Sequence, residues 1–483
     1  MMSSMENEVK PLKRVKVAII GGGVSGATTA VHLSELGISV ALLEKGQGLV
    51  NGPPICHLHA GGNLYREISA TQCIELLEQS IDTVRLFPHT INRRPTIIAT
   101  PKSDGGDPQD ILSRLDIIQS CYQNLIDLDP KNEVLGAASR YFKSYSEIEL
   151  KELSKKQQAN HPVELDDWMI PFAQNTNLEL LKYPVIAVQE YGWSVFRLAA
   201  SATLVLDRIE HCDVMTHTTL IRAQYDDLGW LLTYQDADNR TFQLRSDYLV
   251  NACGYQTGTV DDKANYQRNR MVEFKAAYVT KWSECDQEWP EVIFHGPRGT
   301  SKGMAQLTPY ANGVFQLHGM TEDITLFKDG LVSSTSESAQ PQLPKRLAGK
   351  ITHGWPDEAM SERTSKAITH MEQFIPSFSS AIIAAKPLYG AQQIPGEDAT
   401  LRSTDVSFES RNYARVEVVK GSSALEAARK IVANWKLTTH SNQSIETLHP
   451  VSLSLTYHQV EAKAVELAVT REYPEELALR TGN

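Results

Sequence analysis

The sequence VKVAIIGGGVSG, residues 15–26, decides the fold of this chain. Its first six residues are apolar and rich in β-branched side chains, which is typical of a short buried strand. The glycines that follow satisfy the pattern G-x-G-x-x-G. Residues 27–37 (ATTAVHLSELG) have helical spacing and end in a glycine suited to a helix C-terminus. A second apolar strand, residues 38–43 (ISVALL), leads directly to Glu44, and this order of elements predicts a dinucleotide-binding βαβ unit.

The glycines and Glu44 have distinct physical roles in such a unit. Gly21 permits a tight turn, Gly23 lets the backbone approach a pyrophosphate, and Gly26 lets helix and strand pack closely. The pyrophosphate then lies at the helix N-terminus, where free amides and the helix dipole favour negative charge. Glu44 stands 23 positions after Gly21, close to the ~20 at which an acid accepts hydrogen bonds from a ribose. The alternative is a glycine turn followed by a surface glutamate that arrived there by chance. The residues assigned to the dinucleotide from this unit are Gly21, Gly23, Val24, Ser25, Gly26, Glu44 and Lys45.

Three later stretches have the small-residue character of a cofactor site: residues 56–63 (CHLHAGGN), 247–254 (DYLVNACG) and 418–428 (VVKGSSALEAA). With the glycine turn, they resemble the D-amino-acid-oxidase superfamily of FAD oxidoreductases. In that superfamily such stretches form a loop along the flavin, a late strand and turn near FAD, and a glycine turn with a helix beneath the flavin. The resemblance implies FAD as the cofactor. It adds the following residues to the FAD site: His59, Ala60, Gly61, Gly62, Leu220, Ala252, Gly254, Gly421, Ser422, Ser423 and Ala424.

Two groups within the superfamily are the most similar. Residues 59–65 (HAGGNLY) resemble FAD-dependent glycerol-3-phosphate dehydrogenases, and residues 420–424 (KGSSA) resemble malate:quinone oxidoreductases. The first group has an arginine before the tyrosine, where this chain has Leu64, and Arg66 stands one place later. His59 is also similar to a histidine that some amine-oxidising members link covalently to flavin; the alternative is a histidine that only hydrogen-bonds near the ring.

Composition and charge exclude several classes of protein. The net charge of -11 at pH 7 argues against a nucleic-acid partner, because phosphate binding requires a basic face. No run reaches the ~18 consecutive apolar residues of a membrane helix, and the N-terminus lacks the apolar core of a signal peptide. We therefore expect a cytoplasmic protein with no integral membrane segment. The six cysteines contain no CxxC pair, which predicts neither a metal site nor a disulfide framework.

The chain carries one dinucleotide fingerprint, so its electrons should come from a substrate rather than from NADPH. Flavin accepts the hydride in such reactions, while the protein supplies orientation and charge. We expect FAD-dependent oxidation of a small amino acid, amine or hydroxy acid, with O2 or quinone as the electron acceptor. One alternative is a hydroxy-acid or polyol-phosphate dehydrogenase that passes electrons to quinone. Another is a flavoprotein whose FAD is structural or sensory, or a partner subunit.

Few side chains are candidates for the substrate chemistry. A carboxylate substrate favours an arginine fork, and a hydroxyl substrate requires a base, usually histidine. The catalytic candidates are Tyr65, Arg66, His318 and Tyr389. His318 could also be a packed histidine on an apolar strand, Arg66 a solvated surface arginine, and Tyr389 a residue that packs in a turn.

The expected fold is α/β, with a discontinuous Rossmann-like FAD-binding domain and an inserted mixed-sheet substrate domain. Residues 230–234 and 241–244 predict a hairpin. Residues 332–344 predict a mobile loop, and residues 457–473 an acidic helix. The expected FAD-binding pieces are residues 1–100, 195–262 and 386–438, the substrate-domain pieces are residues 101–194 and 263–385, and residues 439–483 form a helical appendage.

Overall fold

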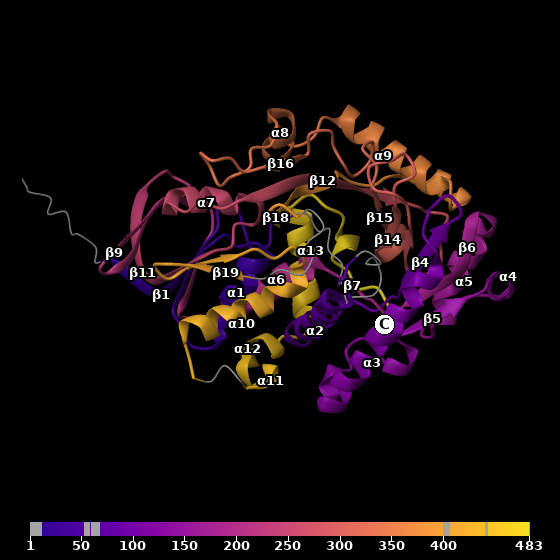
Figure 1. Ribbon diagram of the computed structural model, residues 1–483, viewed down its shortest axis with the longest axis horizontal. Coiled ribbons are helices and arrows are strands. Elements are labelled where there is room, and N and C mark those ends of the chain that lie inside the picture. Colours follow the sequence, from indigo (N-terminus) through magenta and orange to yellow (C-terminus); the bar gives the residue numbers. More distant parts are fainter. Residues whose placement is uncertain (1–11, 53–57, 59–67, 399–405, 440–442, 483) are drawn as a thin grey trace, which may run out of the picture.

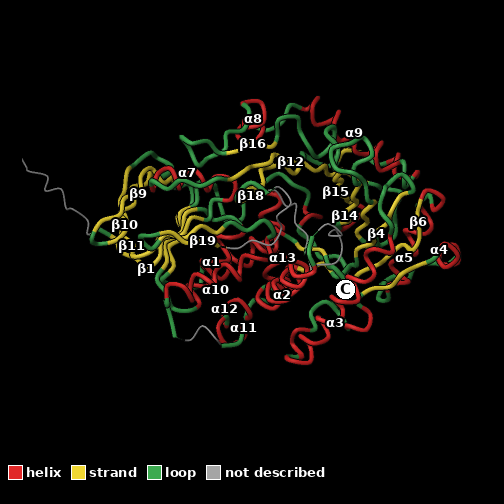
Figure 2. The backbone as a smooth tube through the Cα atoms, in the orientation of Figure 1, coloured by secondary structure: helices red, strands yellow, loops and turns green. Residues whose placement is uncertain are grey.

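Two sheets organise the computed structural model, and each forms the centre of one lobe (Figure 1; Figure 2). The structure describes residues 12–52, 58, 68–398, 406–439 and 443–482. We call the lobe around the eight-stranded sheet the first lobe and the lobe around the ten-stranded sheet the second lobe. None of the helices in these described ranges is long and apolar enough to cross a membrane.

The first lobe contains the βαβ unit expected from the sequence. Its main sheet has the strand order β19-β20-β11-β1-β2-β8, in which β20, β11, β1, β2 and β8 run parallel. The hairpin expected at residues 230–244 is confirmed as the antiparallel pair of β10 and β11. The strands of this lobe are β1 (Lys13–Ile20), β2 (Val40–Leu43), β8 (Cys212–Met215), β9 (Thr219–Asp226), β10 (Gly229–Gln235), β11 (Thr241–Asn251), β19 (Val406–Glu409) and β20 (Tyr413–Val416).

The helices cover both lobes and the bottom of the molecule in Figure 1. The helix that follows the glycine turn ends at Glu35, and Gly37 behind it has a φ of 78°, as the sequence predicts for a C-terminal glycine. The helices are α1 (Val24–Glu35), α2 (Ala70–Leu86), α3 (Leu112–Leu128), α4 (Glu147–Leu153), α5 (Leu165–Asn175), α6 (Val195–Leu206), α7 (Thr257–Ala264), α8 (Lys345–His353), α9 (Asp357–Glu372), α10 (Ala424–Trp435), α11 (Ile445–Leu448), α12 (Pro450–Leu453) and α13 (Tyr457–Thr470).

The period-two alternation of strand β1 builds two cores on its two faces. Val17 and Ile19 are fully buried in the core shared with α1, α6 and α10. Ala18 and Ile20 join a second core with β9, β10 and α7. The sheet is therefore covered by helices on one face and mainly by the antiparallel hairpins on the other, which leaves the carboxyl ends of the parallel strands as the edge for a ligand.

The second lobe is a mixed sheet with the order β16-β12-β15-β14-β13-β4-β6-β5, and β17 and β18 also pair with β12. One apolar face packs against α4, α5 and α9. The strands are β4 (Thr96–Pro101), β5 (Phe142–Tyr145), β6 (Leu181–Val188), β12 (Arg270–Lys281), β13 (Glu291–Phe294), β14 (Ala305–Pro309), β15 (Val314–Gly319), β16 (Leu331–Ser333), β17 (Ile382–Ile383) and β18 (Leu388–Pro395); β3 (Ile91–Asn92) and β7 (Gly192–Trp193) form a separate pair.

Sheet membership divides the chain differently from the expected pieces. Strand β4 lies in the second sheet, although most of it falls within residues 1–100. Strand β18 also pairs in the second sheet, while β19 and β20 pair in the first. All three strands come from the stretch 386–438, which the sequence motifs assign to the FAD-binding domain.

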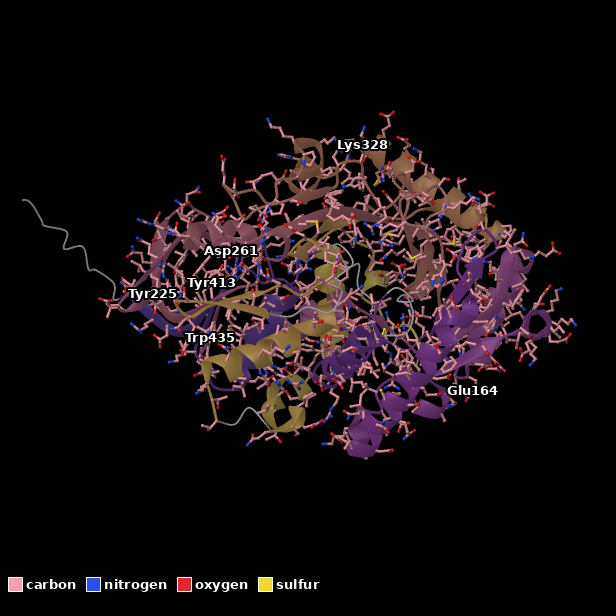
Figure 3. The ribbon with its side chains drawn as sticks, in the orientation of Figure 1. Glu164, Tyr225, Asp261, Lys328, Tyr413 and Trp435 are labelled. Atoms are coloured by element: carbon pink, nitrogen blue, oxygen red, sulfur yellow. The ribbon has the colours of Figure 1, made fainter. Side chains whose placement is uncertain are left out.

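A buried ionic cluster connects α7, the start of β12 and β20. The carboxylate of Asp261 accepts hydrogen bonds from Arg270 and from Arg415, each at 2.5 Å. The hydroxyl of Tyr413 donates to the same carboxylate at 2.8 Å (Figure 3). All four side chains are almost completely buried. Because a buried charge is costly without its partner, these contacts fix the strand that enters the second lobe against the first sheet.

Two further expectations concern loops and the C-terminus. Residues 332–344 are held more firmly than their polar composition suggests, because Asp262 accepts hydrogen bonds from the Ser338 hydroxyl at 2.6 Å and the Ala339 amide at 2.7 Å. Ala339 is fully buried, so this part of the stretch is packed against the fold, and its mobility stays a prediction. The helix expected near the C-terminus is confirmed as α13, which packs on α6.

Candidate functional site

The glycine turn has a geometry that only glycine supports at two of its positions. Gly21 has a φ of 96°, and an added Cβ would lie 2.6 Å from the carbonyl oxygen of Ala252. A Cβ on Gly26 would collide with the carbonyl oxygen of Gly21. These contacts bring the glycine turn, helix α1 and the turn after β11 together, as expected of a phosphate-binding βα turn.

Gly23 has a more open environment than Gly21 and Gly26, the other two glycines of the motif. No described atom lies within 4 Å of a Cβ built on Gly23. Gly23 is also the N-cap of α1, and no described side chain caps its amides. Free amides at a helix N-terminus, with open space in front of them, form an anion site. This arrangement fits the pyrophosphate of FAD.

Glu44 lies at the end of β2 and uses only part of its hydrogen-bonding capacity. Its two carboxylate oxygens accept the amides of Gly22 and Gly46, each at 2.6 Å. An ionised carboxylate has about four lone-pair positions, so acceptor positions remain for ribose hydroxyls. Lys45 is exposed and donates to the side chain of Gln256, beyond the turn that carries Ala252.

The late stretches converge on the same region. A Cβ on Gly421 would collide with the ring of Trp193 and lie 3.4 Å from a methyl group of Val24, at the start of α1. The hydroxyl of Ser422 is buried and has no hydrogen-bond partner in the described part of the chain. Because Ala424 begins α10, two helix N-termini meet here beside an unpaired hydroxyl, which is a suitable environment for the polar groups of a flavin.

The remaining FAD candidates are placed with different clarity. Gly254 has a φ of 55° and open space around it, like Gly23. Leu220 lies at the start of β9, and its backbone carbonyl already accepts a hydrogen bond from Lys263. The FAD candidates His59, Ala60, Gly61 and Gly62 lie outside the described residues, as do the catalytic candidates Tyr65 and Arg66.

The second sheet directs a polar face toward the first lobe. Residues paired directly across strands share a face, and the register pairs Gln306 with His318 and Thr308 with Gln316. Ile293 and Ile98 continue the row of Gln306, and Ile98 belongs to the core of the first lobe. Alternate residues of the same strands pack instead against the outer helices. This polar face therefore lies between the two lobes.

The polar face contains buried side chains whose hydrogen-bonding groups are not all paired within the described residues. Arg94 donates to Glu291 at 2.7 Å, and Gln306 donates to the other oxygen of the same carboxylate. Gln316 is fully buried and accepts from the Tyr310 hydroxyl at 3.1 Å, but its amide nitrogen has no partner within the described ranges. A buried donor without a partner is costly, so this face is suited to a polar ligand.

Tyr389 does not lie with His318. It pairs with Ala276, whereas the neighbouring Ala277 continues the face of His318. The ring of Tyr389 lies 5.6 Å from that of Trp355, on the outer side of the sheet. Burial raises the pKa of Tyr389. The register thus separates two residues that the sequence interpretation placed in one site.

Several side chains of the polar face were missed from the sequence. A usable signal was present in the strands AQLTP (305–309) and VFQLHG (314–319), which alternate apolar and polar residues although both faces are buried. A strand buried on both faces is usually continuously apolar. Alternating glutamine, threonine and histidine therefore indicate a buried polar surface.

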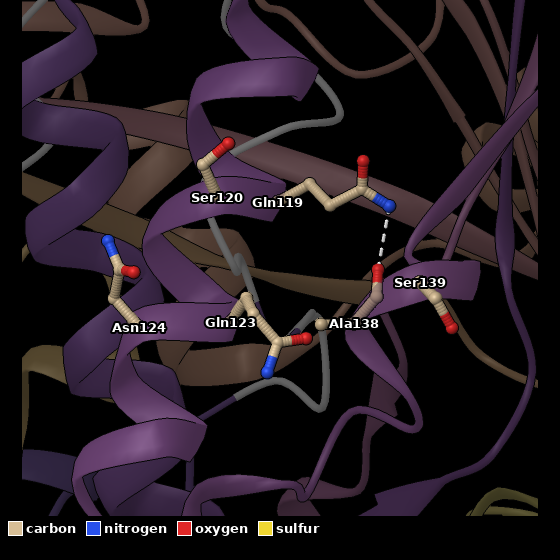
Figure 4. Close-up of a pocket in the computed structure, with 6 residues that line it drawn as sticks. All are labelled: Gln119, Ser120, Gln123, Asn124, Ala138 and Ser139. Carbon is tan, nitrogen blue, oxygen red and sulfur yellow. Dashed lines mark hydrogen bonds between the residues drawn. The ribbon is translucent and has the colours of Figure 1, made fainter.

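A separate hollow of about 560 Å³ lies on α3, away from these residues. Figure 4 shows that its lining side chains are mainly amides and hydroxyls, with Gln119 donating to the carbonyl of Ala138 at 2.7 Å. No charged side chain lines it among the described residues. We find no chemistry in this hollow that resembles a redox site.

Known proteins share part of this sequence and the fold of most of this chain. Residues 16–106 match the family model DAO, described as FAD dependent oxidoreductase. The FAD-dependent monooxygenase cle3 of Aspergillus versicolor is 30% identical over 119 residues, which is 23% of this chain and 23% of that protein. The chain thus matches about a quarter of the length of this curated relative.

Solved structures extend the likeness to most of the chain. Glycine oxidase from Geobacillus kaustophilus has a TM-score of 0.53 at 12% identity, covering 87% of this chain and 94% of its own. L-amino acid deaminase from Proteus vulgaris has a TM-score of 0.57 at 12% identity, with coverage of 92% and 97%. Glycerol-3-phosphate dehydrogenase from Bacillus halodurans, complexed with FAD, has a TM-score of 0.52 at 13% identity, with coverage of 95% and 73%. At these identities the likeness shows the fold, and it confirms the expected fold class.

Proposed function

We propose that this chain, whose residues 16–106 match the DAO family of FAD dependent oxidoreductases, oxidises a small amino acid, amine or hydroxy acid. The bound FAD would accept a hydride from the substrate carbon. The single observation that carries the proposal is the pairing of an open anion site at Gly23 with a buried polar face on the opposite lobe.

The first lobe supports the cofactor half of the proposal. The amides at the start of α1 would hold the pyrophosphate, with Gly23 leaving room for its oxygens. Glu44 would accept the ribose hydroxyls. Gly254, Gly421 and the hydroxyl of Ser422 would line the path of the flavin. Gly23, Gly254 and the hydroxyl of Ser422 are groups that the described structure leaves open.

The second lobe supports the substrate half. His318 and Gln306 lie side by side on the polar face, and His318 is partly accessible. A histidine in this position can accept the proton that leaves a hydroxyl or ammonium group when the carbon is oxidised. Arg94 is already paired with Glu291, so the face offers mainly neutral donors and acceptors. This chemistry suits a small polar substrate that is oriented by hydrogen bonds.

Anaerobic reduction of the flavin tests the proposed function. Purified protein reconstituted with FAD is mixed with amino acids, amines and hydroxy acids without oxygen, and the flavin absorbance is followed. Bleaching by a member of this panel, with slow or no bleaching by NADPH, is the expected result. Rapid bleaching by NADPH alone would favour a monooxygenase, the class named for the Aspergillus relative. Reoxidation of the bleached protein by O2 or by a soluble quinone then distinguishes the two expected acceptors.

A further inference from the structure

The chain segment after Glu44 packs directly on the glycine turn. The amide of Val50 donates to the carbonyl of Gly22 at 2.7 Å. A Cβ on Gly22 would lie only 2.8 Å from a methyl group of Leu49, so the two segments are in close contact. Leu49 and Val50 are both almost completely buried. The shape of the glycine turn therefore depends on the backbone of residues 49 and 50.

Val50 has an unfavourable backbone conformation. Its φ is 52°, in the left-handed region, although it is not a glycine. A β-branched residue in this region is a genuine outlier. Such strain persists only where surrounding contacts hold the backbone in place. The Gly22 carbonyl holds the amide of Val50, which leaves the carbonyl groups of this segment to be held by another contact.

Arg471 supplies this contact from the C-terminal end of the chain. Its Nη1 donates to the carbonyl of Val50 and its Nη2 to the carbonyl of Leu49, both at 2.7 Å. Arg471 directly follows α13, and its contact with Val50 spans 421 residues of sequence. The planar guanidinium fork holds two acceptors in a fixed geometry, so both carbonyl groups are oriented by one side chain.

A cavity of about 410 Å³ lies beside the segment, between α6 and α13, and Gly48, Leu49 and Arg471 line it. Arg471 crosses at the edge of this cavity to reach the two carbonyls.

We infer that Arg471 is a positioning residue for the cofactor. By holding the carbonyls of Leu49 and Val50, it keeps Val50 in its strained conformation and Gly22 in the shape that binds pyrophosphate. This inference rests on the proposed function, because it assumes that FAD occupies the glycine turn. It makes the C-terminal appendage a part of the cofactor site, although no residue of the appendage belongs to a cofactor motif.

Titration of the apoprotein with FAD, followed by quenching of flavin fluorescence, tests the inference. Arg471→Ala should raise the FAD dissociation constant by about tenfold or more, because two charge-assisted hydrogen bonds are lost. Arg471→Lys keeps the charge but not the fork, and should give an intermediate value. Lys463→Ala is the matched control. Lys463 is a cation on α13 that lines the same cavity, but its partner is Glu466. The variant should bind FAD as the wild type does.

A double-mutant cycle separates positioning from general structural damage. Val50→Gly removes the strain, since glycine adopts this conformation at little cost. If Arg471 acts through Val50, Arg471→Ala should weaken binding by less than about threefold in the Val50→Gly background. Equal losses in both backgrounds would overturn the inference. If Arg471→Ala yields no folded apoprotein, the same cycle with Arg471→Lys decides by the same criterion.

The two proposals fail in different ways. A wild-type apoprotein that binds no FAD overturns the proposed function, and the inference with it. A wild-type protein that binds FAD, together with an Arg471→Ala variant of equal affinity, overturns the inference alone.

Discussion

The glycine turn of the first lobe is built from backbone, whereas the polar face of the second lobe is built from side chains. At the turn, amides, carbonyls and the space above Gly23 would provide the proposed cofactor site. At the polar face, Gln306, Gln316 and His318 would provide the proposed substrate site, and the backbone only sets their register. Substitutions should therefore act through shape in the first region and through chemistry in the second.

The largest effect is expected from Gly26→Val in the backbone-built region. Any Cβ at this position collides with the carbonyl of Gly21, so the helix and strand would separate and FAD binding should be abolished. Gly23→Ala provides the contrast within the same turn, because no described atom lies within 4 Å of its new methyl group. Its apoprotein should melt as the wild type does, while its FAD affinity falls at least tenfold.

Calorimetry of the two apoproteins and FAD titration measure these effects. A Gly23→Ala variant with wild-type affinity for FAD would show that the open space is not the pyrophosphate site. A Gly26→Val variant that keeps normal stability and affinity would contradict the backbone-built description of the turn altogether.

Asp261→Asn tests the connection between the two lobes. The substitution preserves shape but leaves Arg270 and Arg415 buried with less compensating charge. Breaking a buried ion pair costs about 3–5 kcal/mol, so the free energy of unfolding should fall by about this amount in urea titrations. A loss below about 1 kcal/mol, the range of exposed pairs, would mean that the cluster does not stabilise the lobe junction.

His318→Ala tests the polar face by chemistry rather than by shape. Loss of a hydrogen bond to a charged group is worth about 1.5–3 kcal/mol, so kcat/KM should fall by roughly 10- to 100-fold with FAD affinity retained. Tyr389→Phe is the control, since its ring packs with Trp355 on the opposite face. Similar losses in both variants would show that the register does not separate them functionally.

The two regions also differ in how far the sequence could predict them. The glycine turn was predictable because its backbone requires glycines at a fixed local spacing. The elements α1, β1, β2 and the β10–β11 hairpin were likewise predictable from local patterns. The polar face was not, because Gln306 and His318 become neighbours only through strand pairing. Sequence distance hides such pairs, even where polar alternation in a buried strand signals them.

Arg471 shows the same limit in a stronger form. It bonds to backbone carbonyls rather than to another side chain, so no residue type near Val50 indicates its presence. The pieces of the discontinuous domains were assigned from the positions of cofactor motifs. A motif locates a turn but not the sheet in which the neighbouring strand pairs, and β4 and β18 illustrate this.

The smallest effect is expected at the other end of α1, where the helix that begins at the backbone-built turn ends in a side-chain network. The ring nitrogens of His32 and His449 lie 3.1 Å apart, and His449 contacts Glu35 at 2.9 Å. Burial lowers the pKa of His32, and the nearby His449 and Arg429 lower it further.

The folded protein therefore keeps His32 neutral, whereas the unfolded chain takes up a proton below about pH 6.5. Stability should then fall as the pH falls below that value, by about 1.4 kcal/mol per pH unit for this group. His32→Asn removes the titrating ring and keeps a polar partner for His449, so urea unfolding across this range should show a shallower pH dependence than in the wild type. Parallel curves for the two proteins would show that His32 is not the group whose proton uptake destabilises the fold.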